Sequence, residues 1–229
     1  MNRWVNDVIN LFFPAVCHIC GNALSPGERF VCGHCLSELP RTGYHRTKMN
    51  PMEERFAGHF PFTRATGHFF YSPDSSLSVL IQDMKYRHFP SIGTILGELT
   101  GKELYTTGFL NDIDVIVPVP MHFIKEARRG YNQTDYIAKG IGRATGLPVI
   151  NALKMTRQRK TQTALDRQQR MANADNLFKG KDKYNLDSKG VLLVDDVCTT
   201  GSTLGAAGFA LTQKWPTASL ALFSLGVTF

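Results

Sequence analysis

Residues 192–204 read LLVDDVCTTGSTL, and this stretch decides how the rest of the sequence is interpreted. An apolar run that starts at Val191 ends in two adjacent carboxylates, Asp195 and Asp196, and a loop of hydroxyl residues and glycine follows. An apolar helical run then begins at Leu204. The order predicts a strand, an acidic pair, a loop and a helix. It places the carboxylates beside backbone N–H groups at a helix N-terminus, which is a ready site for an anion.

The loop has two interpretations. Glycine-rich corners between a strand and a helix are common in α/β proteins, and such a corner need hold no ligand. Here the apolar strand, the acidic pair and the TTGST loop follow one another without a gap. The stretch resembles the 5-phosphoribosyl-1-pyrophosphate (PRPP) motif of type I phosphoribosyltransferases. The resemblance implies that PRPP is bound by Asp195, Asp196, Thr199, Thr200, Gly201, Ser202 and Thr203.

Each part of PRPP needs a different receptor. The amides and hydroxyls of residues 199–203 suit the 5′-phosphate, and Asp195 and Asp196 suit the ribose hydroxyls because carboxylates accept strong hydrogen bonds. The same two carboxylates are the candidate catalytic residues, since their charge favours an oxocarbenium-like transition state at C1′. The pyrophosphate, which chelates Mg²⁺, needs permanent positive charge, and Arg128 and Arg129 of the RRGYN stretch supply it. The alternative for RRGYN is a helix-start turn with exposed arginines.

Four cysteines near the N-terminus form two CxxC pairs, Cys17 with Cys20 and Cys32 with Cys35. This is the ligand spacing of a structural Zn²⁺ site, in which four thiolates close a tetrahedral shell. Two disulfides or four free thiols are the alternatives. Disulfides suit exported chains, and residues 1–13 make a poor signal peptide because polar residues interrupt the apolar run. Free thiols need no paired spacing, so zinc is the expectation.

The length of 229 residues suits one ordinary domain and a small module. We expect an N-terminal helix and zinc ribbon at residues 1–55, a domain at 56–229, and a link between them at 36–60. So small a module cannot bury enough surface to fold alone, and the metal would supply its stability. We expect strands at 60–71, 114–120, 191–194 and 218–227 and helices at 77–86, 92–99, 136–144 and 204–214. Their alternation predicts an α/β fold with a parallel sheet flanked by helices, and ligands at the carboxyl ends of the strands.

The net charge of +7 and the pI of about 9.2 indicate anionic ligands or partners. Six lysines and arginines between Lys154 and Arg170 stand against one acid, Asp166, and a second basic group surrounds Arg128. A solvated basic face without a ligand is the alternative.

Four patterns follow one another along the chain: the two CxxC pairs, PVPMH with RRGYNQ, a basic segment, and DDVCTTGST. The basic segment carries the residues Gln162, Leu165, Arg170, Asn173 and Phe178. Together the patterns resemble the ComF family of competence-associated, phosphoribosyltransferase-like proteins. The resemblance implies a type I phosphoribosyltransferase fold behind a zinc ribbon, with residues 155–172 closing over the site. It leaves two functions open: transfer or sensing of phosphoribose linked to DNA uptake, or binding of single-stranded DNA without catalysis, through residues 154–170.

No stretch approaches the ~20 uninterrupted apolar residues of a membrane helix, so no membrane span is expected and we place the protein in the cytoplasm. Residues 1–13 have apolar side chains at helical spacing and predict a short amphipathic helix. Competence and DNA-uptake proteins are the expected partners, from the resemblance. The sequence shows no pattern for the acceptor of the phosphoribosyl group.

Overall fold

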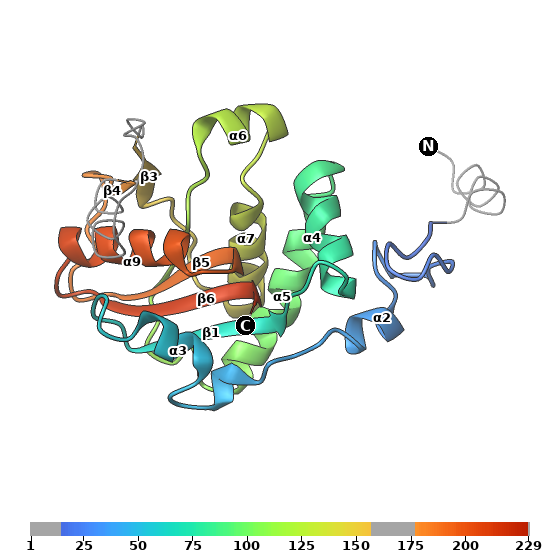
Figure 1. Ribbon diagram of the computed structural model, residues 1–229, viewed down its shortest axis with the longest axis horizontal. Coiled ribbons are helices and arrows are strands. Elements are labelled where there is room, and N and C mark those ends of the chain that lie inside the picture. Colours follow the sequence, from blue (N-terminus) through green and yellow to red (C-terminus); the bar gives the residue numbers. More distant parts are fainter. Residues whose placement is uncertain (1–14, 157–176, 229) are drawn as a thin grey trace.

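The computed structural model describes residues 15–156 and 177–228 (Figure 1). The amphipathic helix expected at residues 1–13 and most of the basic segment expected to close over the site lie outside these ranges. Within them, no helix combines the length and the hydropathy that crossing a membrane requires.

The core of the molecule is a sheet of four parallel strands in the order β1-β6-β5-β2. The strands are β1 (Arg64–Phe70), β2 (Val115–Pro118), β5 (Gly190–Cys198) and β6 (Ser219–Val227). The two inner strands are buried along almost their whole length. Continuous burial of this kind is typical of a parallel sheet that is covered on both faces.

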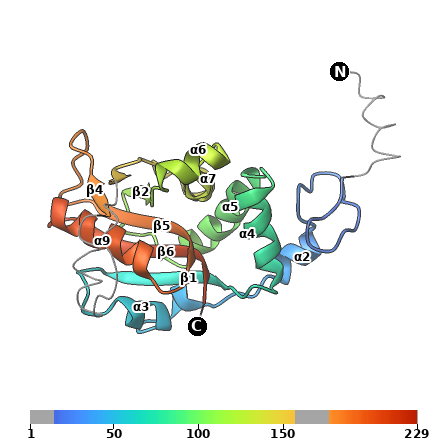
Figure 2. The same ribbon diagram turned by 45° about the horizontal axis from the view of Figure 1, so that its top comes forward.

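Helices cover both faces of the sheet, as the two views of the ribbon show (Figures 1 and 2). Leu192 and Val194 point to one layer, and Leu193 points to the other, because side chains alternate along a strand. The first layer consists of α4 (Ser76–Tyr86), α5 (Ser91–Thr106) and α7 (Gln133–Thr145). The second consists of α3 (Pro51–Phe56) and α9 (Ser202–Lys214). The expected α/β class with a parallel sheet between helices is confirmed.

Helices α5 and α7 pack so closely that their backbones touch. A Cβ atom added to Gly97 would lie 2.2 Å from the carbonyl oxygen of Ile137, and one added to Gly140 would lie 2.2 Å from that of Thr94. Only glycine fits at these two crossings. The contact fixes α7, whose first residues reach the candidate site described below.

The remaining elements are short. They are α2 (Gly33–Ser37), a 3₁₀ turn η1 (Tyr44–Arg46), α6 (Phe123–Arg129), and the antiparallel pair β3 (Leu153–Met155) and β4 (Phe178–Gly180). The expected link at residues 36–60 contains η1 and α3, and Met52 and Phe56 of α3 are fully buried in the core. This stretch therefore packs with the larger domain, and a boundary at residue 55 stays a prediction.

Most expected elements are present, and the central strand differs from its prediction. The expected strand at 191–194 runs on to Cys198, so Asp195 and Asp196 lie within β5 and not after it. The reason is pairing: β6 continues beside the acidic residues, with Asp195 opposite Ser224 and Cys198 opposite Val227. Likewise α7 begins three residues earlier than expected, because the side chain of Asn132 caps it by accepting from the N–H of Thr134.

Candidate functional site

Asp195 and Asp196 lie near the carboxyl end of β5, and each is less than a tenth exposed. Neighbouring residues of a strand point to opposite faces, so the two carboxylates have different surroundings. Asp195 lines a small hollow together with residues 197–204. Asp196 points to the helical layer of α4 and α7, where it meets side chains from both helices.

Two side chains hold Asp196, and neither was among the predicted site residues. The ammonium of Lys85, at the end of α4, lies 2.7 Å from Asp196 Oδ2. The amide of Gln133, at the start of α7, donates to the same oxygen at 2.7 Å. Arg129 in turn donates to Gln133 Oε1. A buried carboxylate needs such partners, and the RRGYNQ pattern already contained Gln133.

The carboxyl of Asp195 has an unusual pKa. Burial is the largest cause and the charge of Asp196 the second, and together they raise the pKa from 3.8 to about 7. The N–H of Asp196, which donates to Asp195 Oδ1 at 2.8 Å, and the charge of Lys85 oppose the rise. Asp195 therefore exchanges a proton near neutral pH, which makes it able to accept from a hydroxyl or to donate to an oxygen.

The loop after β5 forms a tight corner that leads into α9. Gly201 has a left-handed backbone, with φ of +82°, and its Cα packs close to the ring of Phe56. Gly201, the cap residue of α9, has no side chain to accept from the helix end, and Thr200 Oγ1 accepts only a long bond of 3.4 Å from the N–H of Ser202. The first N–H groups of a helix have no partners within the helix, so this end can bind an anion. The hydroxyls of Thr200 and Ser202 lie 2.8 Å apart beside it.

Arg55 of α3 holds the backbone of this loop, and no pattern in the sequence pointed to it. Its guanidinium donates to the carbonyl oxygens of Thr199 at 2.5 Å and Thr228 at 2.6 Å, and more weakly to that of Cys198. In a trans peptide the C=O and the next N–H point in opposite directions. The N–H groups of Thr199 and Thr200 therefore point away from Arg55.

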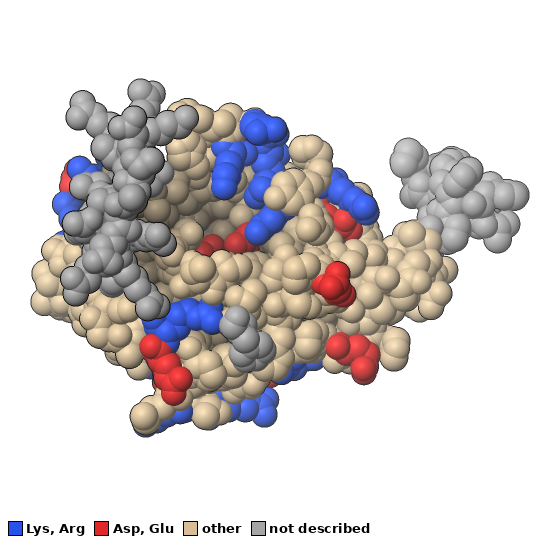
Figure 3. All heavy atoms as spheres, viewed as in Figure 1, with Lys and Arg blue, Asp and Glu red and all other residues tan. Residues whose placement is uncertain are grey.

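The structure brings one of the two predicted arginines to the acidic pair. Arg129 is half-buried and reaches Asp196 through Gln133, with its guanidinium carbon 5.4 Å from the centre of the Tyr86 ring. Arg128, its neighbour on α6, is exposed. Figure 3 shows acidic atoms on the floor of a hollow and lysine and arginine side chains gathered over its edge.

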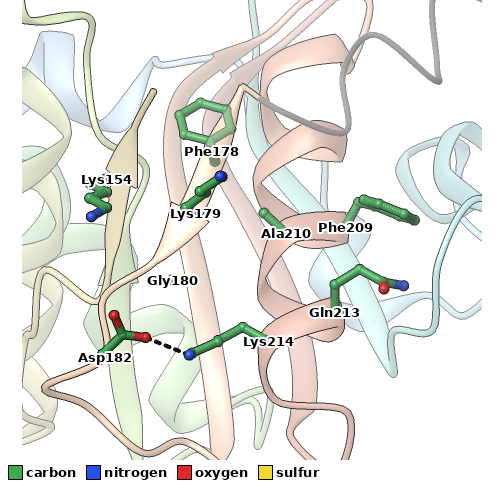
Figure 4. Close-up of a pocket in the computed structure, with 9 residues that line it drawn as sticks. All are labelled: Lys154, Phe178, Lys179, Gly180, Asp182, Phe209, Ala210, Gln213 and Lys214. Atoms are coloured by element: carbon green, nitrogen blue, oxygen red, sulfur yellow. Dashed lines mark hydrogen bonds and ion pairs between the residues drawn. The ribbon is translucent and has the colours of Figure 1, made fainter. Parts of the chain in front are cut away.

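A larger groove of about 350 Å³ lies between β4 and α9 (Figure 4), and neither Asp195 nor Asp196 lines it. Its walls carry Lys154, Lys179 and Lys214, and Lys214 forms an ion pair of 2.6 Å with Asp182. None of the residues predicted to bind PRPP lines this groove.

The four cysteines of the two CxxC pairs converge as the spacing predicted. The sulfur atoms of Cys17, Cys20, Cys32 and Cys35 all lie within 4.8 Å of one another, and those of Cys20 and Cys32 are 3.9 Å apart. Four sulfurs bound at about 2.3 Å to one tetrahedral ion would be about 3.8 Å apart. Burial opposes ionisation of the Cys17 thiol, but backbone N–H groups of Cys20, Cys32 and Ile19 outweigh it and lower the pKa to about 6. The cluster could hold a metal ion such as zinc.

The cysteine cluster packs against α4, at one end of the molecule (Figures 1 and 2). His18 Nδ1 lies 2.5 Å from a carboxylate oxygen of Asp83, which is buried in α4. The ring of His18 also meets Phe30 and Phe89 edge-on. Helix α4 therefore contacts the N-terminal module through Asp83 and the acidic pair through Lys85, which is two residues later in the sequence.

The sequence of the chain is similar to those of several known proteins. The chain is 32% identical over 203 residues to Competence protein F of Haemophilus influenzae, an alignment that covers 82% of this chain and 83% of that protein. The chain belongs to the ComF family. It is also 28% identical over 225 residues to DNA utilization protein YhgH of Escherichia coli, over 90% of this chain and 97% of that protein. Competence protein ComFC of Bacillus subtilis is 31% identical over 113 residues, or 48% of this chain and 43% of that protein. No family model matches the chain.

In this ComF-family chain, Asp195→Asn should raise stability above pH 7. The folded-state pKa of about 7 exceeds the ordinary value of 3.8, so the unfolded chain releases its proton first and stability falls as pH rises from 4 to 7. Above pH 7 the free energy of unfolding is lower by up to about 4 kcal/mol for this reason. Asparagine does not titrate, so urea unfolding should show that the variant is more stable than wild type at pH 8. The difference between their free energies of unfolding should be smaller at pH 5.5.

Asp112→Asn is the matched control for this prediction. Hydrogen bonds from Arg64 are the largest cause that lowers the pKa of Asp112. Its replacement should therefore destabilise the protein at pH 8, the opposite sign. An Asp195→Asn protein that is less stable than wild type at pH 8 would contradict the assignment of the raised pKa.

Proposed function

We propose that this chain binds PRPP with Mg²⁺ at the carboxyl end of β5. The observation that carries the proposal is the position of Asp195, which shares one hollow with residues 197–204, including the N-terminus of α9. Phosphorylated sugars need an anion site and hydroxyl acceptors side by side, and both are present here.

The 5′-phosphate would lie at the loop. The helix end offers N–H groups and a positive dipole, and the hydroxyls of Thr199, Thr200, Ser202 and Thr203 add donors. Support from Arg55 and Phe56 fixes the loop before the ligand arrives, so little ordering is required on binding.

The ribose and the pyrophosphate would extend from the loop toward Asp195 and Asp196. Asp195 and Asp196 would accept from the ribose hydroxyls, and a charged carboxylate pair would favour a cationic C1′. Among the described residues, Lys85 pairs with Asp196 and Arg129 reaches it through Gln133, so these two cations would face the pyrophosphate with its Mg²⁺. Lys85 would then exchange its partner Asp196 for a phosphate oxygen. Arg128 would reach the pyrophosphate only from the exposed rim.

The reaction we propose is transfer of phosphoribose to a nitrogen nucleophile with release of pyrophosphate, and sensing of PRPP without turnover is its alternative. Relatives named for competence and DNA utilization support a role in DNA uptake for either form. A second candidate is binding of single-stranded DNA without catalysis. The net charge of +7 favours it, because phosphate backbones attract basic surfaces.

We also propose that the cysteine cluster binds one structural Zn²⁺. Four sulfurs within 4.8 Å leave no open position for a substrate, and closed Cys₄ sites are structural. The ion would hold the N-terminal module in the shape that presents His18 to Asp83.

Calorimetry with PRPP tests the first proposal. PRPP should bind in the presence of Mg²⁺ and at least about tenfold more weakly with chelator, because the uncompensated pyrophosphate charge would face Asp195 and Asp196. Ribose 5-phosphate should bind without Mg²⁺, since it lacks the pyrophosphate. Equal PRPP affinity with and without Mg²⁺ would contradict the proposed orientation, and absence of PRPP binding would remove the proposal.

A further inference from the structure

The last turn of α4 lies between the N-terminal module and the acidic pair. Both ribbon views place α4 between the module with its cysteine cluster and α6 (Figures 1 and 2). Consecutive residues of a helix are about 100° apart around its axis, so Asp83 and Lys85 leave α4 on nearly opposite sides. Asp83 meets His18 of the module, and Lys85 meets Asp196 of β5.

The module holds this turn through a buried carboxylate. The side chain of Asp83 is 2% exposed, and His18 Nδ1 lies 2.5 Å from its Oδ2 atom. Its Oδ1 atom lies 3.3 Å from the guanidinium of Arg87, which is 73% exposed. An ion pair with so exposed a partner contributes little, whereas a buried carboxylate that loses a hydrogen bond is strongly destabilised. His18 therefore contributes more than Arg87 to holding Asp83 in its place.

Aromatic packing adds to this contact. The ring of His18 meets the ring of Phe89, just after α4, edge-on at 4.8 Å, and Phe30 of the module lies 5.8 Å from the same ring. The N–H of Phe89 donates to the backbone carbonyl of Asp83 at 3.3 Å. The module thus contacts both the end of α4 and the segment that follows it.

The end of a helix needs contacts of this kind. Its last carbonyl groups have no partner within the helix, so other segments and side chains hold the last turn. On the other side of α4, the hydroxyl of Tyr131 donates to the carbonyl oxygen of Met84 at 2.7 Å. Because the side chain of Met84 is fully buried, loss of the His18 contact would loosen the last turn without removing the helix.

Lys85 depends on this turn for its position. Its ammonium lies 2.7 Å from Asp196 Oδ2, at the end of a flexible side chain. A mobile backbone beneath that side chain would add to the entropy lost when the ammonium is held. We propose that His18 is a positioning residue for PRPP: through Asp83 it keeps the last turn of α4 where Lys85 reaches Asp196 and the pyrophosphate. The proposal rests on the proposed function, and it makes PRPP affinity depend on the contact between the module and α4.

Calorimetry with PRPP and Mg²⁺ measures the effect. His18→Ala should weaken PRPP binding about fivefold, and Lys85→Met, which removes the ammonium itself, should weaken it about tenfold or more. The double variant His18→Ala/Lys85→Met should bind no more weakly than Lys85→Met alone, because His18 acts through Lys85. A structural effect of His18 elsewhere in the protein would add to that of Lys85.

Three further variants show whether the contact itself is responsible. His18→Asn should restore PRPP affinity to near that of wild type, because the asparagine amide can donate to Asp83 as the ring N–H does. Asp83→Ala removes the same contact from the side of α4 and should match His18→Ala, so the test stands even where His18→Ala unfolds the module. The matched control is His34→Ala, which changes an exposed histidine within the other CxxC pair and should leave PRPP affinity unchanged.

Acetylation of Lys85 gives a readout that needs no PRPP. An amine held in an ion pair reacts slowly, because it must lose its proton and its partner before it attacks the reagent. Mass spectrometry should show Lys85 acetylated severalfold faster in His18→Ala and Asp83→Ala than in wild type, and at the wild-type rate in His34→Ala.

Several results would overturn the proposal. Wild-type PRPP affinity in both His18→Ala and Asp83→Ala is one, and a wild-type rate of Lys85 acetylation in both is another. Additive losses in the double variant, or an equal loss in His34→Ala, would likewise contradict it. A wild-type protein that binds no PRPP would remove the proposed function, whereas the acetylation rates would still decide whether His18 positions Lys85.

Discussion

Cys32→Ser protein is expected to lose its zinc and to unfold in the N-terminal module while the larger domain keeps its fold. Metal supplies the folding free energy of so small a module, on the order of 10–16 kcal/mol in zinc-finger peptides. A serine hydroxyl is a poor substitute for a thiolate, so the shell of four sulfurs would open. The larger domain should keep most of its core, because a few residues of the module, among them Cys17, Val31 and Cys35, join the layer on one face of the sheet and none joins the other.

Elemental analysis of purified protein measures the first part of this prediction, at one zinc per wild-type chain. Hydrogen exchange measures the second part: protection should vanish around residues 17–35 and persist in β5 and β6. Cys198→Ser is the control, because Cys198 lies at the end of β5 and outside the cluster. Wild-type protein without zinc would end the zinc proposal, and collapse of protection in β5 would contradict the independence of the larger domain.

Asp195→Asn combined with Asp196→Asn is expected to weaken PRPP binding by several kcal/mol. Each carboxylate would lose a charge-assisted hydrogen bond to a ribose hydroxyl, at about 1.5–3 kcal/mol each. The Asp196 change also leaves Lys85 without its ion-pair partner, which strengthens its pull on the pyrophosphate and offsets part of the loss. Calorimetry should show PRPP affinity reduced at least a hundredfold.

Ribose 5-phosphate and inorganic pyrophosphate separate the contributions to this effect. The double variant should bind ribose 5-phosphate much more weakly, and pyrophosphate with Mg²⁺ at least as well as wild type does. Asp112→Asn, at the opposite end of the sheet beside Gly190, removes an acid without touching the site and should leave PRPP affinity unchanged. Unaltered PRPP affinity in the double variant would count decisively against the acidic pair as the sugar site.

Features that short stretches of chain control could be predicted from local patterns of residues. The spacing within each CxxC pair is local, and the four sulfurs do converge. The corner at residues 199–203 is local as well, since a left-handed Gly201 and the apolar run after it are enough to begin α9. Alternation of apolar strands and helices fixed the fold class, because each apolar face must be buried against another element.

The groups that surround the two carboxylates come from distant parts of the chain and could be identified only in the folded protein. Continued pairing with β6 keeps Asp195 and Asp196 within the strand, so their side chains point to opposite faces of the sheet. Lys85 comes to Asp196 from α4, and Arg55 comes to the loop from 144 residues away in the sequence. Such contacts depend on strand order and helix packing, which bring distant segments together by burying apolar surface, and no local pattern of residues records them.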